Sequence, residues 1–271
     1  MKLPFYWVDA FAGRVFAGNP AGVVPLADWL PDSLLQDIAF ENGLPMTAFF
    51  VRQAPACYRL RWFHAGHEAE LCGHATLAAG FTLFTELDEP GDRIEFETRA
   101  GRLAVTRQAV PGAATRFELD FPARPAESLA AADQPPAVLR ALGGGVRELH
   151  RVPGRDGYLA VYERAEDVRT LQPDLAALAA LGDIRVMVTA PGDDCDFVSR
   201  FFAPGGGLPE DAVTGSAHCT LVPYWAGRLG RTEFHARQLS ARGGELWCGL
   251  AGDRVRLAGH ATLYLRGEIS L

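Results

Sequence analysis

The chain has 271 residues, of which 48% are hydrophobic and 22% are charged, and its formal net charge is −7 at pH 7. This charge excludes a nucleic-acid binder driven by electrostatic attraction, because such a protein needs a basic face. No apolar run reaches the roughly 18 residues that suggest a membrane span, and the N-terminal segment has no signal-peptide cleavage site, so we expect a cytoplasmic protein without membrane partners.

The first half of the chain predicts short strands and one early helix. Strands are expected at residues 3–11, 21–26, 47–51 and 57–63, the last with the alternating pattern of a half-buried antiparallel strand. Apolar residues at helical spacing across residues 31–42, followed by Gly43, predict an amphipathic helix with a glycine stop. Residues 93–99 and 102–108 predict a hairpin.

Composition changes after Asp120, where a segment rich in Pro and Ala indicates a passage between domains that continues into a helix at residues 136–143. Strands are expected again at residues 158–163, 184–190, 195–203, 254–259 and 261–271. Strands scattered among isolated helices predict an α+β fold with mostly antiparallel sheets. We predict domains at residues 1–120 and 121–261, with the last strand, near residues 262–271, a candidate to return to the first domain.

The five cysteines are odd in number and scattered, and none forms a CxxC pair. Such spacing disfavours both a disulfide framework and a structural zinc site. We therefore expect reduced thiols.

One sequence unit occurs twice. Arg61, in the run RWF, precedes an acidic loop and then CGHATL at residues 72–77. Arg200, in the run RFF, precedes an acidic loop and then GSAHCTL at residues 215–221. A period this long excludes a solenoid and favours two pseudo-equivalent domains.

Each unit ends in a helix start built from small residues. The first N–H groups of a helix have no intrahelical partner, and small side chains let an anionic group approach them. Two such helix starts facing one cleft would hold the carboxylate of a small substrate, while nearby acids and a histidine move protons. Small residues at a helix start also serve close packing alone, but the paired motifs with upstream acids favour the functional interpretation.

Several segments resemble the PhzF-like family of phenazine-biosynthesis isomerases, which is related in fold to diaminopimelate epimerase. They include VDAFAGRVFAGNPAGVV, RWFHAGHEAELCGHATLAAG, FETRAGRLAV, EDAVTGSAHC and QLSARGGEL, and they follow the family's order along almost the whole chain. The resemblance implies an α+β fold of two pseudo-symmetric domains, each a curved, mostly antiparallel β-sheet wrapped around a central α-helix. It also implies a homodimer, no metal or organic cofactor, and isomerisation of a small carboxylate-bearing metabolite in the interdomain cleft.

By position, the resemblance assigns proton transfer to His74 and Asp211 and ligand binding to Ser216. The residues that it implies as shaping the pocket or offering backbone donors are Asn19, Gly73, Ala75, Thr214 and Gly215. Without the resemblance, Asp9 and Asn19 would be ordinary turn residues.

One departure from the family concerns its general base, normally a glutamate in a segment like LSETAF. The flanks of that segment match here, but the glutamate position is Met46. A thioether accepts no proton at neutral pH, so the usual base is absent. Loss of a general base typically slows a reaction by roughly 10²–10⁴-fold.

Other groups are candidates to replace the glutamate. Cys72 lies at a helix start, where thiols are activated, and a cysteine at the matching place is a base in diaminopimelate epimerase, although an inert buried thiol is the alternative. Further candidates in the two acidic loops are His64, His67, Glu68, Glu70 and Glu210. The two histidines have no evident third ligand and do not predict a metal site.

The sequence leaves three functions open. The first is an isomerase or epimerase that uses Asp211 and His74 for proton transfer. The second is a two-base, racemase-like enzyme in which Cys72 replaces the missing glutamate. The third is a catalytically inactive homologue that binds a small acid.

Overall fold

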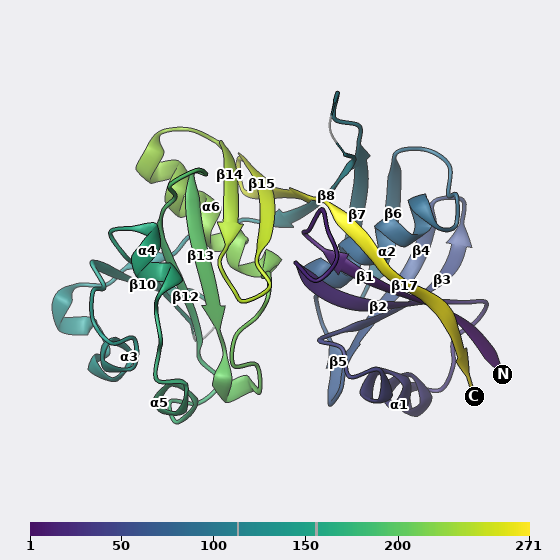
Figure 1. Cartoon of the computed structure of the whole chain (residues 1–271), viewed down its shortest axis with the longest axis horizontal. Helices are drawn as coiled ribbons and strands as arrows, with labels where there is room; N and C mark the ends of the chain where they lie inside the picture. The colour runs from purple at the N-terminus through teal and green to yellow at the C-terminus, as the bar shows by residue number, and fades with distance from the viewer. Residues whose placement is uncertain (113, 155–156) are drawn as a thin grey trace. The chain divides into compact units, whose positions relative to one another are not determined.

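A computed structural model of the chain describes residues 1–112, 114–154 and 157–271 (Figure 1). The chain divides into two compact units, the first formed by residues 1–121 and 257–271 and the second by residues 122–256. The five cysteines, all within the described residues, form no disulfide. None of the helices in the described part is long and apolar enough to cross a membrane.

The first unit contains most of the strands and two helices. Its strands are β1 (Lys2–Ala10), β2 (Asn19–Leu26), β3 (Thr47–Ala54), β4 (Cys57–His64), β5 (His67–Ala69), β6 (Arg93–Thr98), β7 (Gly101–Gln108), β8 (Arg116–Pro122) and β17 (Ala261–Ser270). Its helices are α1 (Asp32–Asn42) and α2 (Gly73–Thr85). The antiparallel pairing of β17 with β1 brings the last strand back to the first unit.

The second unit is built from β9 (Glu127–Ser128), β10 (Glu148–Val152), β11 (Gly157–Val161), β12 (Arg185–Pro191), β13 (Phe197–Phe202), β14 (Glu233–Gln238) and β15 (Gly244–Ala251). Its helices are α3 (Pro136–Ala141), α4 (Ala165–Arg169), α5 (Leu175–Ala179) and α6 (Gly215–Leu229), with 3₁₀ turns at Ala131–Asp133 and Pro204–Gly206. The remaining strand, β16 (Arg254–Gly259), includes the last residues of this unit and the first that return to the other.

The two units repeat one order of strand pairing. In the first, β1–β2 is antiparallel, β2–β3 parallel, β3–β4 antiparallel, β4–β6 parallel and β6–β7 antiparallel. In the second, β10–β11, β11–β12, β12–β13, β13–β14 and β14–β15 alternate in the same way. Helices lie in the parallel crossovers: α1 and α2 in one unit, and α4, α5 and α6 in the other. This is the structural counterpart of the repeat in the sequence.

Helix α1 begins and ends close to the predicted bounds. Leu35, Ile38 and Ala39 form its buried side and belong to the same core cluster as Phe49 and Val51 of β3. The helix ends because Gly43 adopts the left-handed conformation, with φ 60°, and donates its N–H to the carbonyl of Phe40.

Each unit has one long central helix. Helix α2 is buried along nearly its whole length and lies against β1, β2, β3 and β7 (Figure 1). Helix α6 lies against β15, and its Trp225 ring stacks on Phe197 at a centroid distance of 5.6 Å. Trp225 also donates its indole N–H to the Thr189 hydroxyl. A buried indole needs such a partner, so this bond fixes α6 against β12.

Asp9 and Asn19 have side chains typical of turns, but the structure places both in strands, and Asp9 falls within the strand predicted at residues 3–11. Both are buried in paired strands, where Asp9 lies opposite Pro20 and Ala10 opposite Asn19. The turn lies between them, and positive φ angles occur at Phe11, Phe16 and Gly18. Polar residue type alone favoured a turn, whereas the antiparallel pairing of β1 with β2 places these residues inside the sheet.

Gly80 allows α2 to approach β7 closely. A Cβ atom at this position would lie 2.6 Å from a γ-carbon of Val105. We therefore expect Gly80→Ala to lower the free energy of unfolding by about 1–3 kcal/mol through overpacking, although alanine favours the helix by about 1 kcal/mol.

The matched control is Gly227→Ala in α6, where a Cβ would have nothing within 4 Å. This change should be neutral or stabilising, and urea unfolding followed by circular dichroism measures both variants. Equal midpoints for the two variants would contradict the close approach of α2 and β7.

Candidate functional site

In the first unit, an ion pair fastens the loop that precedes α2. The Arg61 guanidinium donates to both carboxylate oxygens of Glu68, at 2.8 and 2.7 Å, and Arg99 donates to Glu68 at 3.0 Å. The hydrogen bond from Arg61 holds the pKa of Glu68 below its ordinary value. Glu68 is therefore committed to the ion pair and is a poor substitute base.

The two histidines of this loop lie side by side. The rings of His64 and His67 have centroids 5.4 Å apart, and burial, followed by the neighbouring His67, lowers the pKa of His64. Glu70 is exposed at the end of the loop. The described residues include no group of three or more His, Cys, Asp or Glu side chains placed to hold a metal ion.

At the start of α2, Cys72 and His74 are in contact. Cys72 is the N-cap residue, with φ −141° and ψ 111°, but its side chain does not cap the helix. Its Sγ atom lies 3.4 Å from Nδ1 of His74, and both side chains are buried. Burial lowers the pKa of His74 to about 4, so the imidazole is neutral at pH 7. Gly73, between these two residues, is half-buried, and Ala75, which follows His74, is fully buried.

Met46 and Asn19 lie at the starts of two paired strands, Met46 just before β3 and Asn19 as the first residue of β2. Met46 is half-buried immediately before β3, and its carbonyl accepts the N–H of Gly22 from β2 at 3.0 Å. Asn19 is the first residue of β2 and is fully buried. Met46 thus holds its place through its backbone, and its side chain supplies no proton acceptor.

The second unit repeats the ion pair of the first. Arg200 donates to both carboxylate oxygens of Glu210, at 2.7 and 2.9 Å, and also to the carbonyls of Val168 and Leu171. Each arginine lies over an aromatic ring of its own strand, Arg61 over Phe63 and Arg200 over Phe202, both at 5.0 Å. Both carboxylate oxygens of Glu210 accept hydrogen bonds from an arginine, as those of Glu68 do. Asp211 is therefore a better candidate than Glu210 for proton transfer.

Asp211 is held at the start of α6 by its neighbours. Its backbone N–H donates to the carbonyl of Phe201, and its carboxylate accepts the hydroxyl of Thr214 at 2.6 Å. Thr214 is the N-cap residue, yet its side chain makes no cap hydrogen bond because it donates to Asp211. Gly215, the first residue of α6, is buried.

Gln238, at the end of β14, is a residue to which the sequence gave no role. Its carbonyl oxygen accepts the N–H of Thr214 at 2.8 Å, and its amide donates to the carbonyl of Asp211 at 2.8 Å and to the Thr214 hydroxyl at 3.1 Å. The side chain is 1% exposed, so these bonds are shielded from water. Gln238 therefore positions Asp211 and Thr214. The only sequence signal was the match of QLSARGGEL to the family.

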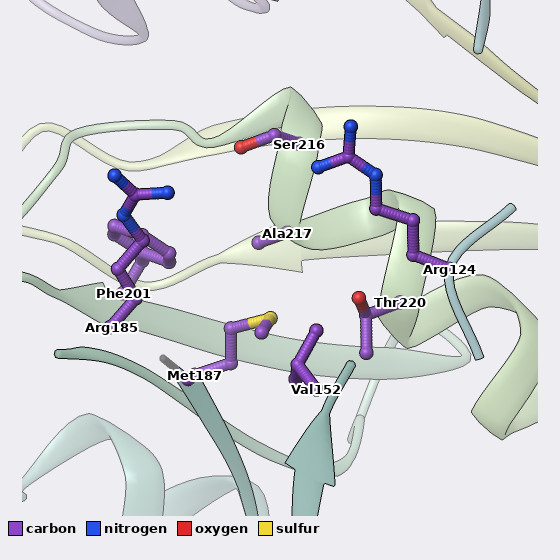
Figure 2. Close-up of a pocket in the computed structure, with 9 residues that line it drawn as sticks. Arg124, Val152, Arg185, Met187, Phe201, Ser216, Ala217 and Thr220 are labelled. Carbon is purple, nitrogen blue, oxygen red and sulfur yellow. The ribbon is translucent and has the colours of Figure 1, made fainter. Parts of the chain in front are cut away.

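Ser216, the second residue of α6, lines a pocket inside the second unit (Figure 2). The pocket has an empty volume of about 330 Å³, part of it open to solvent. Its polar lining includes Arg124 and Arg185 as well as Ser216, and its apolar lining includes Val152, Met187 and Phe201. The sequence carries no motif that signals a role for these two arginines.

The described groups thus form two sets, one in each unit. The first unit offers a neutral imidazole beside a thiol at a helix start, and the second offers a buried carboxylate beside a helix start. Carboxylate, imidazole and thiol side chains are the usual groups for proton transfer. Uncapped helix starts favour anions because their N–H groups and the helix dipole point outward.

Comparison with known proteins identifies relatives along the whole chain. A family model described as phenazine biosynthesis-like protein matches residues 8–267. An uncharacterized isomerase of Pseudomonas aeruginosa is 50% identical over 100% of both chains. The crystal structure of a PhzF family protein from Enterococcus faecalis matches 100% of both chains, with a TM-score of 0.93 and 43% identity. A hydroxyproline epimerase from Agrobacterium vitis, covering 100% of this chain and 93% of its own, shares only the fold, with a TM-score of 0.64 and 12% identity.

His218 gives the second unit a pH-dependent stability. It is fully buried, Thr214 O lies 2.9 Å from its Nδ1 atom, and burial lowers its pKa to about 4 from 6.5. The unfolded chain therefore binds the proton more readily, so the contribution is complete above about pH 6.5 and is lost as the pH falls toward 4.

We expect the stability advantage of the wild type over His218→Asn to shrink by roughly 2 kcal/mol between pH 7 and pH 4.5. Urea unfolding at both pH values measures it, and the variant corrects for carboxylates that titrate in the same range. Parallel stability curves for the two proteins would contradict a buried neutral His218.

Gln238→Ala should lower the free energy of unfolding by roughly 2–4 kcal/mol. It removes the side-chain oxygen that accepts the buried N–H of Thr214 and the side-chain N–H that donates to the buried carbonyl of Asp211. Gln238→Glu keeps the acceptor for Thr214 but loses the donor to Asp211, so it should also destabilise. Gln53→Ala, on an exposed part of β3, is the control and should change stability by less than about 0.5 kcal/mol. Urea unfolding that ranks Gln238→Ala with the control would remove the positioning role.

Proposed function

Because the chain belongs to the phenazine biosynthesis-like, or PhzF-like, family, we propose that it is an isomerase that moves a proton on a small carboxylate-bearing metabolite without a cofactor. The names of its relatives support the isomerase class. The observation that carries the chemistry is Asp211, a buried carboxylate fixed by Thr214 and Gln238 at the start of α6. A carboxylate held in this way is pre-organised for proton transfer.

The proposed step is abstraction of a proton from carbon. Asp211 takes the proton, and the electron pair of the broken C–H bond moves into the π system that includes the substrate carboxylate. Return of a proton at another carbon restores a neutral carbon framework and completes the isomerisation. The Ser216 hydroxyl and the N–H groups at the starts of α2 and α6 would bind the carboxylate, whose negative charge they stabilise.

His74 has a different role from that of a charged acid. Its pKa of about 4 keeps the imidazole neutral at pH 7, so the resting ring has one donor and one acceptor nitrogen and can pass on one proton as it takes up another. Met46 supplies no base at the position of the family's glutamate. The proposal therefore uses Asp211 as the principal base and His74 as the relay.

A second candidate rests on the contact between Cys72 and His74. The 3.4 Å distance between Sγ and Nδ1 lets the imidazole exchange a proton with the thiol, as an activated cysteine requires. In this racemase-like mechanism, Cys72 is one base and Asp211 the other. The remaining candidate, an inactive homologue that binds a small acid, is favoured by Met46 alone.

Proton exchange in heavy water, followed by NMR on a panel of small amino and hydroxy carboxylates, tests the proposed function. We expect a protein-dependent loss of a C–H signal, slowed roughly 10²–10⁴-fold by Asp211→Asn. Asp37→Asn, on the exposed side of α1, removes the same charge elsewhere and should leave the exchange rate unchanged. Equal exchange by Asp211→Asn and the wild type would overturn the role of Asp211.

Two further variants separate the candidates in the same assay. Met46→Glu restores a carboxylate at the family's base position and should raise the exchange rate. Cys72→Ser with the wild-type rate would exclude the racemase-like mechanism. If no compound exchanges with the wild type or with Met46→Glu, while a carboxylate still raises the melting temperature, the protein is a binder, since ligand binding stabilises by mass action.

A further inference from the structure

The pocket beside Ser216 contains two guanidinium groups that the proposed chemistry does not use. Arg124 follows β8, and its backbone N–H donates to the carbonyl of Cys219 in α6 at 2.8 Å, which fixes it beside that helix. Arg185 is the first residue of β12. In Figure 2 both guanidinium groups lie on the same side of the pocket as the Ser216 hydroxyl, with Val152 and Met187 toward the other side.

These arginines differ from Arg61 and Arg200. Arg61 and Arg200 each meet a glutamate through two hydrogen bonds. Arg124 forms no ion pair with the residues that the structure describes. Arg185 meets only Asp183, at 3.6 Å, and that carboxylate is 61% exposed. The pocket therefore holds positive charge that its own acids neutralise weakly.

Apart from Gly157 and the hydroxyl of Thr220, the rest of the pocket lining is apolar. Val152, Met187 and Phe201 are all buried side chains of strands β10, β12 and β13, and Ala217 of α6 joins them. The empty volume of about 330 Å³ includes space open to solvent, and only about 20 Å³ of it admits the centre of a water-sized molecule, so an occupant would lie across the mouth of the pocket. A pocket with guanidinium groups on one side and apolar side chains on the other suits a molecule with an anionic group on an apolar stem.

We propose that this pocket binds an oxoanion carried on an apolar stem, with Arg124, Arg185 and Ser216 holding the oxoanion and Val152, Met187 and Phe201 holding the stem. Guanidinium groups bind carboxylate and phosphate through the same paired hydrogen bonds, so both anions share this chemistry. The inference rests on the proposed function in one respect. Ser216 lines this pocket and is also a substrate-binding residue of the proposed isomerase, so the occupant is the substrate. The substrate class is then an amino or hydroxy acid, or another carboxylic acid, that carries an apolar body, and such acids belong in the exchange panel.

Isothermal titration calorimetry with four probes tests the pocket directly. Hexanoate and hexyl phosphate carry the stem, and acetate and inorganic phosphate lack it. We expect the stemmed probe to bind more tightly than its stemless partner in each pair, and the tighter of the two stemmed probes identifies carboxylate or phosphate as the anion. Arg124→Met and Arg185→Met should each raise the Kd of that probe about tenfold or more, through loss of a charge-assisted hydrogen bond.

The matched control is Arg140→Met, which removes one positive charge from the exposed side of α3 in the same unit. It should leave the Kd unchanged. Unchanged binding by both pocket variants would overturn the inference, and so would an equal loss in Arg140→Met, which would indicate attraction by net charge alone. Arg124→Lys and Arg185→Lys keep the charge but lose the paired donors, and we expect them to bind more weakly than the wild type.

Failure of the pocket and failure of the proposed function give different results. Asp211→Asn should bind the probe as the wild type does, even though it loses proton exchange. Probe binding without exchange of any acid would refute the isomerase and leave the pocket intact. Exchange that is insensitive to Arg124→Met and Arg185→Met would refute the pocket and leave the isomerase intact.

Discussion

Each unit holds one shielded ion pair, formed by an arginine in a strand and a glutamate in the segment that precedes the long helix. Arg61 and Glu68 are 17% and 13% exposed, and Arg200 and Glu210 are 10% and 24% exposed. Pairs this shielded are strongly destabilised when one partner is removed, unlike surface pairs. Each pair fastens the acidic loop to its strand. The loop in turn sets where the helix begins.

The ion pairs separate Glu68 and Glu210, whose carboxylates are held by arginines, from Asp211, which is the proposed base. Glu68 and Glu210 give both carboxylate oxygens to a guanidinium group, so neither is available to take a proton from a substrate. Asp211 follows Glu210 directly, and its carboxylate accepts the Thr214 hydroxyl while its backbone N–H donates to the carbonyl of Phe201. On the proposed function, the two adjacent acids therefore differ in role, because Glu210 pairs with Arg200 and Asp211 takes the proton.

Much of the fold was predictable because its signals are local. The helix at residues 31–42 follows from apolar spacing and Gly43, and the repeat follows from two similar runs of letters. What escaped prediction depends on pairing between distant segments. Gln238 reaches Asp211 only because β14 pairs with β13, and Arg124 and Arg185 share a pocket only because α6 packs beside β12. Asn19 has a turn-forming side chain and lies outside the strand predicted at residues 21–26, and the pairing of β1 with β2 places it in the sheet.

The two units have diverged in electrostatics while keeping one topology. The first unit carries the sulfur-containing side chains of Met46 and Cys72 and the imidazole of His74, which burial keeps uncharged at pH 7. The second carries the carboxylate of Asp211 and the guanidinium groups of Arg124 and Arg185. On the proposed function, the positive charge that binds an acidic substrate therefore comes from the second unit. On the same proposal, the first unit contributes the neutral imidazole of His74 as the proton relay, and the second unit also contributes Asp211 as the base.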